Sequence, residues 1–77
     1  MTSNSFDKLS MIFMDLFELN DIPVDFIEMR MGDIDNWDSI GNFNLLLMIE
    51  QEFNLNFTVE QLGELNNIRS IYEVINS

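Results

Sequence analysis

The stretch that decides the fold is "SIGNFNLLLMIEQEF", residues 39–53. Its apolar residues recur at spacings of three and four, which is the period of a helix with apolar sides. They form two neighbouring stripes, the first made of Leu45, Leu46, Ile49 and Phe53 and the second of Ile40, Phe43 and Leu47. Two stripes are wider than the one face that a helix needs to bury. We therefore predict a helix over residues 39–53, with the first stripe in the core and Leu47 outside it.

The chain before this helix divides into another helix and a long loop. Residues 5–19 carry apolar side chains at helical spacing, with Ser5 as a candidate cap, Asp7 in the positive first turn and Pro23 beyond the end. Residues 20–37 show no sustained period and predict a long connection. We expect this loop to be held to the core by its apolar residues, which are Val24, Phe26, Ile27, Met29, Met31, Ile34 and Trp37.

Two further helices follow. Thr58 and Gln61 have the spacing of a capping box, so "TVEQLGEL" predicts a short third helix. Asn67 is a candidate cap for a last helix. The residues of that helix expected to face inward are Ile68, Ile71, Tyr72 and Ile75. No strand pattern of useful length occurs, so the predicted fold is all-α: a small four-helix bundle with three longer helices, a short third helix and a long loop between the first two.

The composition limits what such a domain does. A chain of 77 residues predicts a single domain over residues 1–77. It contains neither cysteine nor histidine, so it has no thiolate ligand for zinc and lacks the commonest general base. These absences argue against a self-contained active site, and we predict that the protein is not an enzyme.

The charge balance points to protein partners. Fourteen acidic residues face three basic ones, Lys8, Arg30 and Arg69, which gives a net charge of -11 at pH 7. Nucleic acid and anionic membrane surfaces would be repelled, whereas a basic patch on another protein would be attracted. An alternative is that the acidity only keeps a small hydrophobic chain soluble.

No targeting segment is evident in the sequence. The apolar stretch "MIFMDLFEL" is interrupted by Asp15 and Glu18, which makes it too short and too charged for a signal peptide or a membrane span. We therefore expect no membrane insertion and a cytoplasmic location.

The aspartates in "GDIDNWDSIGNFN" suggest a calcium-binding loop, but the ligand positions do not fit one. Counting from Asp33, Asp35 fits the third position, but Trp37 offers no oxygen at the fifth. Asp38 takes the place of the glycine that turns the chain, and Asn44 replaces the closing glutamate. We predict no metal site.

Ser39 is the more informative residue of this stretch. A serine at a helix start lies beside unpaired backbone N–H groups and the positive end of the helix dipole, where a phosphate is favoured. With no histidine in the chain and no lysine nearby, Ser39 is not the nucleophile of a hydrolase triad. It could instead accept a phosphate ester installed by another enzyme. The alternative is that Asp38 or Ser39 merely caps the helix.

The stretch "WDSIGNFNLLLMIEQEFNLNFTVEQLGELNNIRSIYEVI" resembles the acyl carrier protein family, which includes the peptidyl carrier proteins. That family has Asp-Ser-Leu or Asp-Ser-Ile at the start of the second helix, then an aliphatic helix ending in acidic residues and Phe, a short third helix and an aliphatic last helix. The segments that match in order and spacing are Asp38-Ser39-Ile40, Glu50-Gln51-Glu52-Phe53, "TVEQLGEL" and Ile68 to Ile75.

The resemblance implies a function as a carrier. Ser39 matches the serine that receives a 4'-phosphopantetheine arm from coenzyme A, and Asp38 matches the acidic residue that the phosphopantetheinyl transferase recognises. The thiol of the arm holds an acyl or aminoacyl group as a thioester. The implied partners are the transferase, an acyl- or aminoacyl-loading ligase, and acyl-transferring or condensing enzymes. A free monomer suits such a shuttle.

The second helix departs from the carriers of general fatty acid synthesis. Those carriers have carboxylates just after the serine, whereas here that surface contains Gly41, Asn42 and Asn44. Trp37 before the aspartate is more familiar in stand-alone carriers of specialised pathways. We expect an apolar partner face, and assign to it Ile40, Leu47, Met48 and Glu50. The alternative from another class is an unmodified acidic interaction module that uses the same helix as a docking face.

Overall fold

The computed structural model describes residues 5–76, and its elements confirm the all-α prediction. Helices account for all its regular structure, and the isolated bridge between Arg30 and Asn67 is the only β-type pairing in residues 5–76. In chain order the elements are α1 (Ser5–Phe17), the 3-10 helix η1 (Phe26–Glu28), α2 (Ser39–Phe53), α3 (Val59–Glu64) and α4 (Ile68–Ile75). None of these helices has the length and apolar character needed to cross a membrane.

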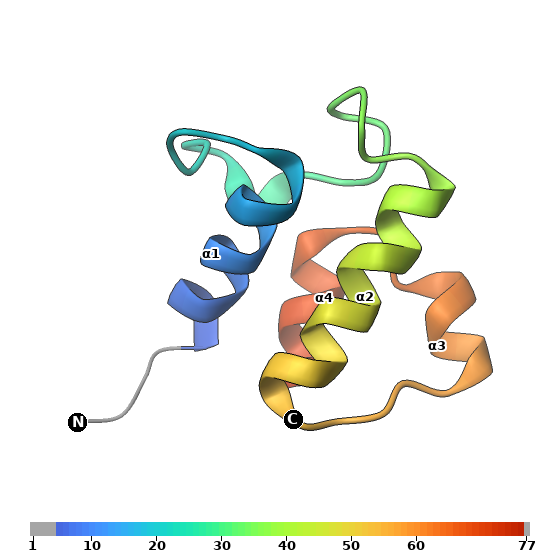
Figure 1. Cartoon of the computed structure of the whole chain (residues 1–77). Helices are drawn as coiled ribbons and strands as arrows, with labels where there is room; N and C mark the ends of the chain where they lie inside the picture. The colour runs from blue at the N-terminus through green and yellow to red at the C-terminus, as the bar shows by residue number, and fades with distance from the viewer. Residues whose placement is uncertain (1–4, 77) are drawn as a thin grey trace.

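The three longer helices pack together, and the short α3 lies at the side. α1 contacts both α2 and α4, while η1 packs on α4. Figure 1 shows α1 and α3 on opposite sides of α2 and α4. The first turn of α2 is next to the long loop that comes from α1 (Figure 1), so the loop positions the start of α2.

The core combines residues of the helices with residues of the loops. Its buried apolar members are Leu9, Ile12, Phe13, Phe17, Phe26, Met29, Trp37, Leu45, Leu46, Ile49, Phe57, Leu65, Ile68 and Ile71. Phe13 lies at the aromatic centre, because its ring meets those of Phe17, Phe26 and Trp37 edge-on at centroid distances of 4.9, 5.0 and 5.0 Å. Edge-to-face contacts at this distance are favourable beyond the area they bury.

The long loop is held to the core as predicted, except at Val24. Phe26, Met29 and Trp37 are buried, whereas Val24 is fully exposed. Val24 lies in a turn closed by a hydrogen bond from Phe26 N to the Pro23 carbonyl (3.1 Å), and this turn points Phe26 inward and Val24 outward.

Backbone pairing also fixes the loop to the segment between α3 and α4. Met31 N donates to the Asn66 carbonyl at 2.8 Å, and Ile68 N donates to the Met29 carbonyl at 3.0 Å. Residues far apart in the sequence therefore hold the loop that leads to α2.

The first helix ends two residues earlier than predicted. Glu18 adopts a left-handed backbone conformation (φ 56°), and Leu19 N donates to the Met14 carbonyl at 2.9 Å. This is the geometry that ends a helix after Phe17. Ser5 is itself the first helical residue, so the predicted cap at Ser5 is wrong, and the residue before it lies outside the described range.

The caps of the last two helices are confirmed. The Thr58 side chain accepts from Gln61 N at 3.0 Å, and the Gln61 side chain accepts from Thr58 N at 2.9 Å, which completes the capping box. Asn67 Oδ1 accepts from Ser70 N at 2.8 Å. Each cap satisfies a backbone donor that the helix leaves unpaired.

Candidate functional site

Ser39 is the first residue of α2, and Asp38 is its N-cap. The Asp38 carboxylate accepts from Gly41 N at 2.8 Å, and the Asp38 carbonyl accepts from Asn42 N at 2.8 Å. Ser39 and Asp38 are both exposed. Of the two residues proposed as caps, Asp38 makes the capping bond, which leaves the Ser39 hydroxyl available at the surface.

Gly41 lets the loop before α2 pass close to the first turn of the helix. A Cβ atom at Gly41 would lie 2.2 Å from the Asn36 carbonyl oxygen and 3.2 Å from the Phe17 ring. Side-chain carbon atoms do not come that close to a backbone oxygen, so only glycine fits without moving the loop. Gly41 was predicted to be on the surface of α2, and this is wrong because Gly41 is buried.

Asn42 joins three segments through buried hydrogen bonds. Trp37 Nε1 donates to Asn42 Oδ1 at 2.9 Å, and Asn42 Nδ2 donates to the Leu65 carbonyl at 2.8 Å. Buried polar groups that are fully paired favour one specific arrangement of the segments they connect. Asn42 was also predicted to be on the surface. Its spacing of three, four and seven residues from Leu45, Leu46 and Ile49 is the signal that places it on the buried side instead.

Gly41→Ala provides a test of the close approach between the loop and α2. We expect the substitution to lower the free energy of unfolding by about 1–3 kcal/mol, because overpacking outweighs the gain of about 1 kcal/mol in helix propensity. A chemical denaturation curve measures this change. Gly63→Ala is the matched control, since no atom outside its own helix backbone and its chain neighbours lies within 4 Å of a Cβ there. It should be neutral or stabilising, so equal effects of the two substitutions would contradict the close approach.

The outward side of α2 exposes large apolar side chains. Ile40 is 73% exposed, Phe43 47% and Leu47 37%. Their spacing of three and four residues places them on one side of the helix. The structure therefore brings together two residues of the predicted partner face, Ile40 and Leu47, and adds Phe43. Phe43 was predicted only to be a member of the second apolar stripe.

Met48 and Glu50, the other two predicted partner residues, lie at the edges of this side. Met48 is half-buried and lines a groove between α1 and α2. Glu50 is half-buried, and its carboxylate accepts from Phe57 N at 2.7 Å. Glu50 therefore has a bonding partner in the loop that leads to α3.

Three acidic residues, Asp33, Asp35 and Asp38, precede Ser39 closely in the sequence. Asp33 and Asp38 accept hydrogen bonds from backbone N–H groups, those of Arg30 (2.9 Å) and Gly41 (2.8 Å). Within residues 5–76, no three acidic side chains converge into a group that could hold a metal ion. Arg69 forms an ion pair with Glu28.

Comparison with known protein families, with curated proteins and with solved structures finds no match for this chain. The fold and the site define a small acidic helical bundle with an exposed serine at the start of α2.

Proposed function

We propose that this protein is an acyl carrier protein that holds an acyl or aminoacyl group on a 4'-phosphopantetheine arm attached to Ser39. The observation that carries the proposal is the placement of Ser39, which is exposed, opens α2 and directly follows the capping Asp38. The order of helices agrees with the resemblance to the acyl carrier family found in the sequence.

The residues at the start of α2 fit a phosphate ester on the serine oxygen. The Asp38 carboxylate accepts a hydrogen bond from the backbone N–H group of Gly41. The backbone N–H groups of Ser39 and Ile40 have no hydrogen-bond partner in the part of the chain described. Unpaired N–H groups and the positive end of the helix dipole favour a negative charge at this place. Exposure of Ser39 would also let a separate enzyme reach the hydroxyl group.

The attachment step is a phosphoryl transfer. The Ser39 hydroxyl oxygen would form a bond to the phosphorus that bears pantetheine, and the bond from this phosphorus to the adenosine bisphosphate half of coenzyme A would break. The serine proton would go to a base of the transferase, since this chain has no histidine to receive it. The arm would supply the thiol that a cysteine-free chain lacks.

The enzymes that load and unload the cargo would dock on the outward side of α2. Ile40, Phe43 and Leu47 give this surface an apolar character, and their exposure supports recognition by apolar contact more than by charge. We therefore place the carrier in a specialised pathway, as a cytoplasmic monomer that moves between a loading ligase and acyl-transferring or condensing enzymes.

The test is covalent labelling with coenzyme A that bears a fluorophore on its thiol. After incubation with a broad-specificity phosphopantetheinyl transferase, a carrier becomes fluorescent in a denaturing gel. An unmodified interaction module stays dark while an established carrier protein labels in a parallel reaction. The dark result would reject the carrier function and favour the module.

Asp38→Asn separates recognition of the carboxylate from its capping role. Asparagine caps helices as well as aspartate does, so we expect the free energy of unfolding to change by less than about 0.5 kcal/mol. We expect arm transfer to slow roughly tenfold at low salt, because a cationic surface of the transferase would lose its acidic contact. The rates of arm transfer at low and moderate salt measure this. Equal rates for the two proteins would show that Asp38 is only a cap.

A further inference from the structure

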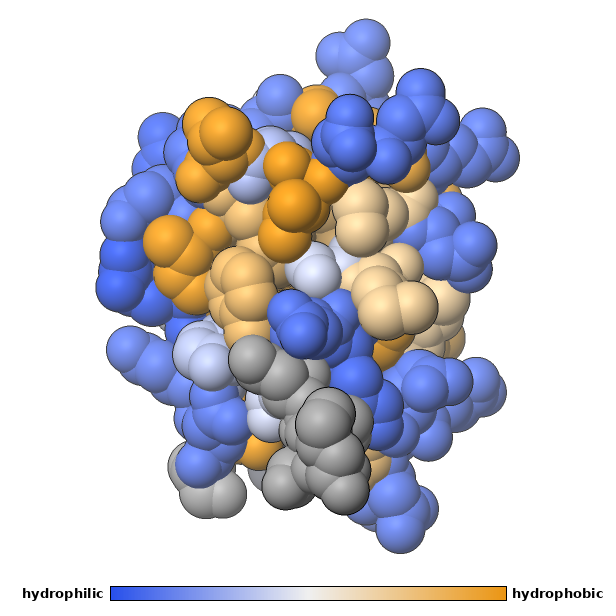
Figure 2. All heavy atoms as spheres, turned by 90° about the vertical axis from the view of Figure 1, so that its left-hand side faces the viewer, coloured by the Kyte–Doolittle hydropathy of each residue, from blue (hydrophilic) through white to orange (hydrophobic). Residues whose placement is uncertain are grey.

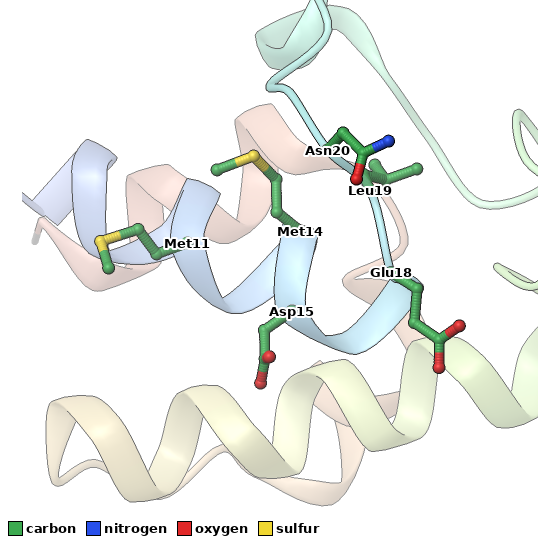
Figure 3. Close-up of a pocket in the computed structure, with 6 residues that line it drawn as sticks. All are labelled: Met11, Met14, Asp15, Glu18, Leu19 and Asn20. Carbon is green, nitrogen blue, oxygen red and sulfur yellow. The ribbon is translucent and has the colours of Figure 1, made fainter.

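A second apolar surface lies on α1, far from Ser39 in the sequence. Met11 is 64% exposed, and with Met14 and Leu19 it lines a shallow groove of about 460 Å³. Figure 3 shows these three side chains along the second half of α1 and the residues that follow it. The acidic side chains of Asp15 and Glu18 complete the groove together with Asn20.

The loop that follows α1 also exposes apolar side chains. Val24 is fully exposed and Ile22 is 36% exposed, and both belong to the loop that follows α1. Figure 2 views this side of the molecule and shows apolar side chains gathered on it within a polar surround. Exposed apolar patches that are surrounded by polar residues mark interaction sites.

The charges beside this surface are mainly acidic. Asp15, Glu18, Asp21 and Asp25 are all exposed. Lys8 is the single basic residue of α1, and its ammonium lies 5.0 Å from the centre of the Phe53 ring and 3.4 Å from the Glu52 carbonyl oxygen. The surface therefore combines an apolar centre with an acidic edge, which fits a partner that is both apolar and basic.

The spacing on α1 favours a helical partner. Met11, Met14 and Asp15 are three and four residues apart, so they share the side of α1 opposite the buried Leu9 and Phe13, and Glu18 directly follows the helix. Methionine side chains are unbranched and adapt to varied apolar partners, as they do where grooves bind amphipathic helices. A second copy of this chain is a poor occupant, because two chains of net charge -11 repel each other.

We propose that the groove on α1, formed by Met11, Met14 and Leu19 beside Asp15 and Glu18, docks a basic amphipathic helix of a partner protein. This surface is on α1, whereas the proposed enzyme-docking face is on α2. The proposal depends on α1 and the residues that directly follow it, and it holds whether or not Ser39 carries an arm.

The probe is a labelled synthetic peptide that forms a helix with leucine on one side and lysine on the other. Fluorescence anisotropy measures its Kd for the full chain. We expect the double variant Met11→Gln, Met14→Gln to raise Kd roughly tenfold, and Val59→Gln at an exposed position of α3 to leave Kd unchanged. Binding should weaken with salt, and a peptide with glutamate in place of lysine should not bind. A second double variant, Asp15→Asn with Glu18→Gln, should weaken binding without altering the apolar centre.

Several outcomes would overturn this proposal. One is a Kd unaffected by both double variants. Another is an equal rise in Kd for the methionine variant and for Val59→Gln. Self-association that the methionine substitutions abolish would assign the groove to a second copy instead. Thermal melts verify that the variants fold. If the variants accept the arm at the wild-type rate, a change in Kd reports on the groove and not on Ser39.

Discussion

Leu46→Ala is expected to unfold the protein or to lower its free energy of unfolding by about 2–5 kcal/mol. Leu46 has no exposed surface and belongs to the core cluster that joins α1, α2 and α4. A small domain has a total stability near the lower end of about 5–15 kcal/mol, so a cavity of this size removes a large part of it. A thermal melt followed by circular dichroism measures the loss.

Leu47→Ala is the matched control, one position along the same helix. Leu47 is 37% exposed and lies on the outward side of α2, so its truncation should shift the melt far less. If α2 docks partner enzymes as proposed, acyl loading of this variant by the cognate enzyme should fall roughly tenfold. A variant that melts as early as Leu46→Ala would contradict the assignment of the partner face.

Local sequence signals predict most of the fold. The period of residues 39–53 gives α2 with its observed bounds, and the side chains of Thr58 and Asn67 cap α3 and α4 as expected. The end of α1 is missed because Glu18 takes a left-handed conformation, which glycine usually signals. The exposure of Val24 is missed because it depends on a turn, and apolar character alone does not say which way a loop residue points.

The candidate site is only partly predictable from the sequence. The place of Ser39 and Asp38 at a helix start follows from neighbouring residues, and the structure agrees with it. The buried roles of Gly41 and Asn42 depend on Asn36 and on the distant Leu65, which no local pattern brings together. Such contacts are set by the tertiary fold.

Ser39→Ala is expected to abolish arm attachment and to leave the fold intact. Asp38 provides the capping bond, so removal of the Ser39 hydroxyl leaves that bond in place. Alanine is also the better helix former, so we expect the free energy of unfolding to change by less than about 0.5 kcal/mol. Ser70→Ala in α4 is the control, because it removes a serine hydroxyl far along the chain from the proposed attachment point. Matching melts for the three proteins would show that any difference in modification arises at Ser39.

The most direct measurement is the intact mass of wild type, Ser39→Ala and Ser70→Ala after incubation with coenzyme A and a phosphopantetheinyl transferase. We expect wild type and Ser70→Ala each to gain the mass of one phosphopantetheine arm, and Ser39→Ala to gain nothing. Arm attachment at Ser39 is contradicted if wild type stays unmodified while an established carrier protein is modified in parallel, or if Ser39→Ala also gains the arm.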